Sequence, residues 1–217
     1  MNDIFSVWKP VDITTYDIIR KIKEISKIKK IGHCGTLDPF AEGVVIVCKG
    51  DATKDSLFYM NKNKKYTAFI KFGAETDTLD KTGEIIKCDN KIILDSKTIR
   101  KSLDSFIGTI NQIPPYYSAK KINNVKMYDL ARKQIFVRLK PVQVTIENIK
   151  LIDLVDNYAT IEVECKKGTY IRSLARDIAY ANGTYGYLES LVRTSIGEFN
   201  ISNSIYYKDL KECNFIN

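Results

Sequence analysis

The sequence predicts an α+β fold with a mixed, largely antiparallel central sheet flanked by helices. Segments that alternate apolar and polar side chains outnumber segments with helical spacing, and two of the alternating segments are joined by a short turn. No repeat, linker or low-complexity block marks a boundary within the 217 residues. We therefore expect a single domain over residues 1–217.

Three segments have the periodicity of amphipathic helices. Residues 16–28 place isoleucines on one face and follow Thr14 or Thr15, either of which is a suitable N-cap. Residues 96–107 repeat apolar side chains at helical spacing after a polar turn. The same spacing runs through residues 171–182, where Asn-Gly ends it.

Four short segments have the sequence pattern of β-strands. Residues 44–48 form an apolar run, and residues 65–72 alternate inward and outward side chains. Residues 142–146 and 159–165 also alternate, and Asp-Asn at 156–157 suits a turn between them. These two segments predict a pair of antiparallel strands.

The charge balance favours a polyanionic partner. The chain has 34 Lys and Arg against 26 Asp and Glu, a formal net charge of +8. Nucleic acid is the leading candidate for such a partner. A Lys-rich surface also keeps a protein soluble, so charge alone does not decide between nucleic-acid binding and solubility.

The cysteine and histidine content argues against a metal site and a disulfide framework. Five cysteines are an odd number, none forms Cys-x-x-Cys, and there is one His. We expect reduced thiols and no metal. Neither a signal peptide nor an apolar run of membrane-spanning length is present, which predicts a soluble cytoplasmic protein with no membrane partner.

The strongest motif is the loop Gly32–Gly43, which reads GHCGTLDPFAEG. Its three glycines permit positive φ, and Asp38 before proline is biased away from helix, which would present its carboxylate outward. The alternative is that Asp38 caps a turn and His33 packs locally, the commoner outcome for an arbitrary loop of this kind. The spacing matches neither the P-loop nor the dinucleotide fingerprint.

This string resembles the signature around the catalytic aspartate of the TruB family, the bacterial-type tRNA pseudouridine-55 synthases. Further blocks resemble family segments in the same order, so that the similarity spans nearly the whole chain. They are Trp8–Pro10 with Thr14–Thr15, Lys65–Tyr66, Gly73–Asp80 with Thr82–Gly83, Gln112–Ala119, Lys167–Asp177 and Leu191–Phe199.

The resemblance implies the pseudouridine synthase fold and an isomerase that converts a uridine at position 55 of the tRNA T-loop to pseudouridine. Asp38 would be the covalent nucleophile, acting on a nucleotide flipped out of its stack. Arg172 would keep that carboxylate ionised and oriented. Tyr66 would stack on the base and assist proton removal. No cofactor is implied.

Other residues are assigned to substrate binding by the same resemblance: His33, Leu191, Arg193, Lys9, Lys120 and Arg132. The last two belong to a basic stretch at about 116–140, which resembles an insertion that grips the T-stem-loop. The alternative is a solvated basic helix or hairpin. Taken singly, an isolated Leu is more often a core residue, and a lone His is more often structural than functional.

The chain departs from the family pattern in two places. Asp12 stands where the family usually has Gly, which leaves the backbone conformation and any RNA contact of that turn open. The sequence ends at Asn217, and we expect no small C-terminal PUA domain of the kind that family members often carry. We expect a monomer.

Two other hypotheses stay open at this stage. The basic charge also suits an RNA-binding or RNA-folding module without catalytic activity. A small-molecule hydrolase using His33 and Asp38 would need a nucleophilic Ser or Cys with an oxyanion loop, and the chain has no Gly-x-Ser-x-Gly.

Overall fold

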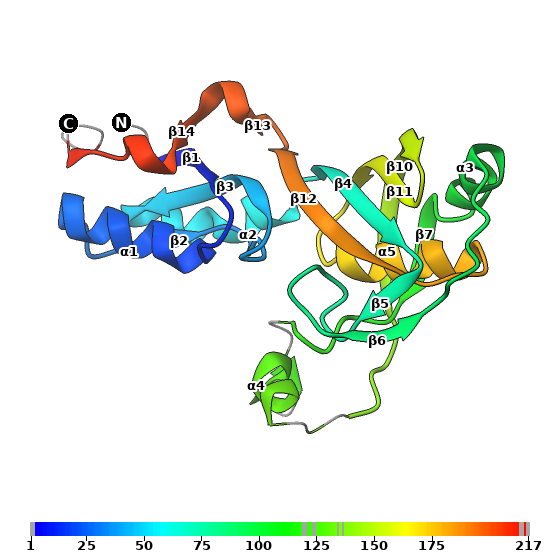
Figure 1. Ribbon diagram of the computed structural model, residues 1–217. Helices are drawn as coiled ribbons and strands as arrows, with labels where there is room; N and C mark the ends of the chain where they lie inside the picture. Colours follow the sequence, from blue (N-terminus) through cyan, green and yellow to red (C-terminus); the bar gives the residue numbers. More distant parts are fainter. Residues whose placement is uncertain are drawn as a thin grey trace. The chain divides into compact units, whose positions relative to one another are not determined.

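Figure 1 shows the computed structural model, which describes residues 3–118, 121–122, 125–133, 135, 137–212 and 215. The chain divides into two compact units: unit 1 comprises Met1–Thr67 and Leu191–Asn217, and unit 2 comprises Ala68–Ser190. Two strands, β4 (Lys64–Phe72) and β12 (Gly186–Ile196), begin in one unit and end in the other. The single domain expected from the sequence remains a prediction.

Unit 1 is a sheet with one long helix. Its sheet order is β14-β1-β3-β12, with β2 on β3 and β13 on β12. The β1–β3 and β2–β3 pairs are antiparallel, whereas β12 runs parallel to β3. The elements are β1 (Ile4–Lys9), α1 (Thr15–Ser26), β2 (Ile31–His33), β3 (Glu42–Lys49), the 3₁₀ helix η1 (Gly50–Asp55), α2 (Ser56–Asn61), the end of β12 (Gly186–Ile196), β13 (Phe199–Asn200), η2 (Ile201–Asn203), β14 (Ser204–Tyr206) and η3 (Tyr207–Asp209).

Helix α1 confirms the first predicted helix. Thr14 is its N-cap, and Thr14 and Asp17 form a reciprocal capping box. Ile18 and Ile22 are fully buried on the face that the sequence spacing indicated. The helix ends at Ser26, two residues earlier than predicted, because Lys27 takes a left-handed conformation at φ 56°.

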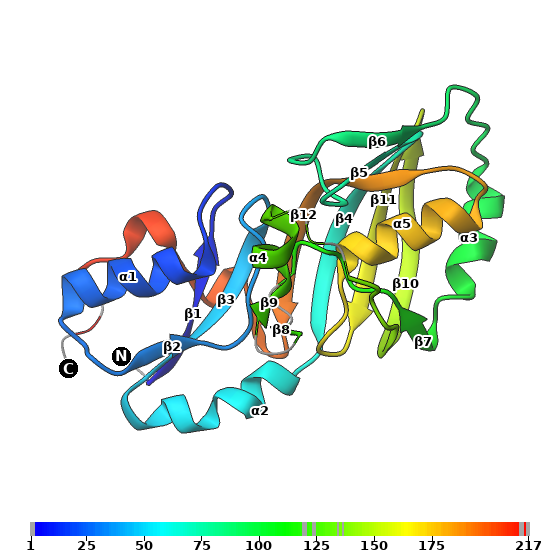
Figure 2. The same cartoon turned by 90° about the horizontal axis from the view of Figure 1, so that it is seen from below.

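Unit 2 is built on the strand order β12-β4-β11-β10-β7. Helix α5 lies along one face of these strands (Figure 2), and seven of its residues are buried. The elements are β4 (Lys64–Phe72), β5 (Ala74–Thr76), β6 (Ile85–Cys88), α3 (Ser96–Asp104), β7 (Gly108–Gln112), β8 (Lys121–Ile122), β9 (Val125–Lys126), α4 (Met127–Arg132), β10 (Val142–Val155), β11 (Tyr158–Cys165) and α5 (Ile171–Ala181).

The β10–β11 hairpin was predicted correctly but is longer than expected. Asp156, at φ 52°, lies in the turn between the strands. Strand β10 continues from 146 to Val155 through register shifts at Ile146/Asn148 and Leu151/Asp153. Such irregularities interrupt the period-two pattern, which hid this part of the strand from sequence analysis.

The predicted fold class is confirmed, since the sheet is mixed and its pairs are largely antiparallel. The basic stretch at 116–140 contains both a small hairpin, β8–β9, and the short helix α4. Strand β12 was missed, because its burial does not alternate strictly. Within the described residues, no helix is both long and apolar enough to cross a membrane.

Gly43, the last residue of the Gly32–Gly43 loop, fixes where β3 meets β12. It pairs with Arg193 in the β3–β12 register and has φ +125°. A Cβ at this position would lie 2.3 Å from the backbone oxygen of Arg193 and 2.8 Å from its carbonyl carbon. Only glycine allows the two backbones to approach this closely.

Replacing Gly43 with alanine should therefore lower the free energy of unfolding by about 2–4 kcal/mol, through steric clash and backbone strain. The matched control is Gly32→Ala, because a Cβ there meets nothing within 4 Å and φ is not positive. That variant should stay within about 0.5 kcal/mol of the wild type. Urea unfolding measures both, and equal stability of the two variants would contradict the close approach.

Candidate active site

Asp38 lies in the loop between β2 and β3, and it is partly exposed. The residues around it are held inward: Leu37 is 4% exposed and Phe40 is 3% exposed. The backbone oxygen of Asp38 accepts a hydrogen bond from the Ala41 N–H at 3.1 Å. The loop is thus anchored on both sides of Asp38 by apolar side chains.

Arg193 stabilises this loop from β12. It is 2% exposed, so its charge is buried and must be hydrogen-bonded. Nε donates to the carbonyl of Val44 at 2.7 Å, Nη1 to that of Thr36 at 3.0 Å, and Nη2 to that of Gly35 at 3.3 Å. One guanidinium therefore connects the start of β3 to the segment that precedes Asp38.

Lys9 has an equivalent role on the other side of the loop. Its side chain lies at the end of β1 and is fully buried. The ammonium donates to the carbonyls of Pro10 at 2.8 Å, Ile13 at 2.8 Å and Pro39 at 3.2 Å. A lysine ammonium has three donors. Two of them bind the turn after β1, and the third binds the loop that carries Asp38.

The turn after β1 keeps a glycine-like backbone although it carries an aspartate. Asp12 has φ 64°, in the left-handed region that Asp tolerates better than most residues. Its N–H donates to the Pro39 carbonyl at 2.8 Å. The Thr15 hydroxyl adds a second link, donating to the Leu37 carbonyl at 3.0 Å and accepting from the Leu37 N–H at 2.9 Å. Asp12 thus adopts a left-handed conformation that glycine also favours, and its N–H is hydrogen-bonded to the loop that carries Asp38.

The electrostatics follow from burial. Burial lowers the pKa of Lys9 to about 8; attraction to Asp38 opposes this shift, and the nearby Arg193 charge adds to it. Burial also lowers the pKa of His33, with Arg193 contributing and a backbone hydrogen bond at Gly35 opposing. At neutral pH the loop therefore carries a neutral imidazole near the buried Arg193 cation.

Three further predicted residues lie in unit 1. Tyr66 points inward from β4 and is 8% exposed. Leu191 is 4% exposed and lies two residues before Arg193 on β12, so their side chains share one face of the strand. His33 ends β2 and is half-buried. Unit 1 thus contains Asp38, Lys9, His33, Tyr66, Leu191 and Arg193.

Arg172 belongs to unit 2, at the start of α5, and is 5% exposed. Its Nη1 donates to the Thr78 carbonyl at 2.9 Å and lies 3.4 Å from Oδ2 of Asp80, and Nη2 donates to the Tyr117 carbonyl at 2.8 Å. Asp80 is itself 4% exposed, and its Oδ1 accepts from the Thr82 N–H at 3.0 Å. These contacts fix the guanidinium.

Asp80 has no role predicted from the sequence, although it lies in one of the blocks that resemble the family. A buried carboxylate is costly unless it is paired, so Asp80 and Arg172 depend on each other. The sequence feature that could have indicated Asp80 is its place at the end of Gly73–Asp80, with hydroxyl residues around it. Arg172, the partner of Asp80, lies 92 residues away along the chain, and no local pattern reveals such a pairing.

Two predicted RNA-binding residues fall where the structure gives no side-chain detail. Lys120 lies outside the described residues, and Arg132 ends α4 with its side chain likewise outside them. Their assignment stays a prediction. Among the described residues, no group of three or more His, Cys, Asp and Glu side chains is placed to hold a metal ion.

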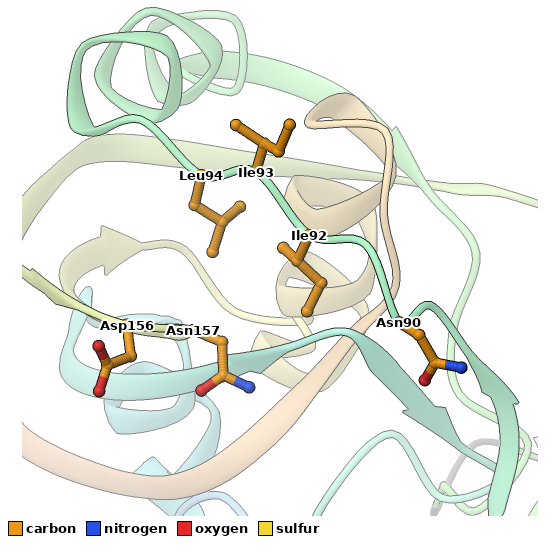
Figure 3. Close-up of a pocket in the computed structure, with 6 residues that line it drawn as sticks. All are labelled: Asn90, Ile92, Ile93, Leu94, Asp156 and Asn157. Atoms are coloured by element: carbon orange, nitrogen blue, oxygen red, sulfur yellow. The ribbon is translucent and has the colours of Figure 1, made fainter.

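A hollow on unit 2 contains none of the predicted site residues. Figure 3 shows its lining, which is Asn90, Ile92, Ile93, Leu94, Asp156 and Asn157. The only carboxylate there is that of Asp156, in the β10–β11 turn, and no cationic side chain lines the hollow. It therefore lacks the carboxylate–cation combination found around Asp38.

A solved structure shares this fold. The chain superposes on a chain in the crystal structure of a Cbf5-Nop10-Gar1 complex with a TM-score of 0.75 at 25% identity, covering 95% of this chain and 53% of that one. This chain thus spans about half the length of that solved chain. The match shows that this chain has the pseudouridine synthase fold.

Sequence comparison identifies the family. Residues 23–171 match the model of the TruB family pseudouridylate synthase N-terminal domain. The tRNA pseudouridine synthase B of Clostridium tetani is 44% identical over 214 residues, which cover 99% of this chain and 74% of that protein. The enzyme of the same name from Fusobacterium nucleatum is 46% identical over 201 residues, covering 93% and 70%. The chain belongs to the TruB family.

The buried Lys9 should make stability depend on pH in a defined direction. In the folded chain it loses its proton near pH 8, whereas in the unfolded chain it stays protonated to about pH 10.5. Between these values the unfolded state binds more protons, so the contribution of Lys9 to stability rises with pH.

Comparison with Lys9→Met, which keeps the length of the side chain and removes the charge, isolates this contribution. The wild type should gain stability relative to Lys9→Met as the pH rises from 8 towards 10.5, measured by urea unfolding at a series of pH values. A difference that stays constant over this interval would show that Lys9 titrates like an exposed lysine.

Proposed function

We propose that this chain isomerises the uridine at position 55 of the tRNA T-loop to pseudouridine, with Asp38 as covalent nucleophile. The observation that carries the proposal is the partly exposed Asp38 on a loop whose backbone is bound by two buried cations, Lys9 and Arg193. Membership of the TruB family supports it. A preorganised carboxylate at the surface suits attack on a substrate from outside.

The reaction needs no group that the chain does not supply. The bond from ribose to the base nitrogen is broken, the base rotates, and it is rejoined through carbon 5 without net oxidation or reduction. A carboxylate acts as a nucleophile only when ionised. We assign the support of that charge to Arg172, whose guanidinium is held by Thr78, Asp80 and Tyr117. No cofactor or metal takes part.

The target base must leave its stack before the reaction. We assign base stacking and help with proton removal to Tyr66, and the apolar wall of the base pocket to Leu191. Both side chains are largely buried, as expected for residues of a base pocket with little water. We assign an RNA contact near the flipped nucleotide to His33, which is neutral at pH 7 because burial lowers its pKa.

Lys9 and Arg193 were predicted to bind the substrate, but both side chains are buried. Lys9 and Arg193 donate to backbone carbonyls, so we propose that they act mainly by positioning the loop that carries Asp38. Electrostatic attraction to the phosphates is assigned instead to other cations of a chain with net charge +8. Within the insertion, Lys120 and Arg132 are the proposed contacts with the T-stem-loop.

We further propose that the protein acts as a monomer in the cytoplasm, with tRNA as its partner. The relatives named tRNA pseudouridine synthase B support tRNA over other RNAs. Binding should weaken steeply with salt, because phosphate contacts release counterions.

The test is to map pseudouridine in an unmodified tRNA transcript after incubation with the purified chain, by carbodiimide labelling and primer extension. One new pseudouridine should appear, at position 55. A transcript with cytidine at that position should bind equally well and gain none. Pseudouridine elsewhere would contradict the assigned position, and tightly bound but unmodified tRNA would favour an RNA-binding module without catalysis.

A further inference from the structure

Two buried cysteines lie in contact, and one of them belongs to the loop that carries the proposed nucleophile. Cys34 belongs to the Gly32–Gly43 loop that carries Asp38, and Cys48 belongs to β3. Both are 0% exposed, and their sulfur atoms are 3.0 Å apart. The proposed reaction uses neither thiol, so this contact is not explained by it.

The backbone holds the two thiols on one face of neighbouring strands. In the β2–β3 register Gly32 lies opposite Cys48, and the Cys34 N–H donates to the Ile46 carbonyl at 2.9 Å. Cys34 and Cys48 are therefore diagonal neighbours across an antiparallel pair, and the contact between their sulfur atoms shows that the two side chains turn toward each other. Both belong to one apolar cluster with Val44 and Ile46.

The two thiols differ in acidity. The contact between the two sulfur atoms, in which either can be the donor, lowers the pKa of the Cys48 thiol, whereas the same contact and burial raise the pKa of the Cys34 thiol. Thiolate is the reactive form of cysteine, so Cys48 is the thiol that attacks an oxidant first. Cys34 is then the neighbour that resolves the product.

We propose that Cys34 and Cys48 form a reversible disulfide when a peroxide reaches them, and that this bond switches off the proposed enzyme by moving the Asp38 loop. The Cys48 thiolate attacks one peroxide oxygen, giving a sulfenic acid and releasing water. The Cys34 sulfur then displaces the sulfenic hydroxyl as a second water. Two thiols lose two electrons in total, and one peroxide becomes two waters.

The bond would displace the loop at a sensitive point. Contact at 3.0 Å must shorten to about 2.05 Å, a movement of roughly 1 Å. The residues that follow Cys34 are Gly35 and Thr36, whose carbonyls accept from Arg193. A misplacement of about 1 Å in a catalytic constellation can lower turnover by about 100-fold.

The chemical part of the proposal can be tested without any activity assay. A Cys88→Ala/Cys165→Ala/Cys213→Ala variant leaves Cys34 and Cys48 as the remaining cysteines. After treatment with hydrogen peroxide, the folded variant is alkylated in denaturant and digested. Peptide mass spectrometry should find residues 34 and 48 linked, with the loss of two hydrogens, and dithiothreitol should restore both thiols. Two freely alkylated thiols after treatment would overturn the proposal.

The functional part rests on the proposed function and uses the same variant. Turnover on tRNA should fall by about 100-fold as the linked fraction approaches one, and recover with dithiothreitol. Adding Cys48→Ala, or Cys48→Ser if the alanine variant unfolds at lower temperature, should remove the peroxide sensitivity and leave the starting turnover intact.

Failure of the disulfide proposal can be distinguished from failure of the proposed function. A linked protein that keeps full turnover would refute the coupling to the loop. Reduced protein that binds tRNA without modifying it would refute the proposed function, while the mass measurement would still decide whether the disulfide forms. In the wild type the exposed Cys88 should react with peroxide sooner than the buried pair, because burial limits access.

Discussion

The structure around Asp38 depends on the burial of two positive charges. Lys9 and Arg193 are the largest fully buried side chains of the described core that carry a charge. Their donors go to backbone carbonyls of the loop that carries Asp38, of the turn after β1 and of the start of β3. Removing a cation from water costs several kcal/mol unless its donors are satisfied. The loop conformation and the burial of the cations therefore require each other.

This arrangement explains which parts of the chain could be predicted from sequence. Helix α1 and the β10–β11 hairpin were predicted because periodicity and turn residues are local properties. The parallel pairing of β12 with β3, and the bond from Arg172 to Asp80, join residues far apart in sequence. The resemblance identified Lys9 and Arg193, but only the structure shows that their partners are backbone carbonyls, which leave no trace in a sequence.

The same loop shows that motif residues encode backbone geometry as well as chemistry. Gly43 is needed because Arg193 of the next strand lies against its Cα. Asp12 stands where the resembling family usually has glycine; it adopts the left-handed conformation, and its N–H donates to the Pro39 carbonyl. The substitution is therefore compatible with the loop, because Asp is among the residues that tolerate positive φ. The identity at such a position matters less than the conformation it permits.

The most direct test of the account compares Asp38→Asn with Asp12→Asn, a matched change in the adjacent turn at a residue whose conformation suits asparagine. The assay is tritium release from tRNA labelled at carbon 5 of uracil, with tRNA affinity measured in parallel. Asp38→Asn should bind tRNA normally and lose at least about 10⁴-fold in turnover, the scale expected for a lost nucleophile, while Asp12→Asn stays active. Substantial tritium release by Asp38→Asn would contradict the assignment of the nucleophile and with it the account of the loop.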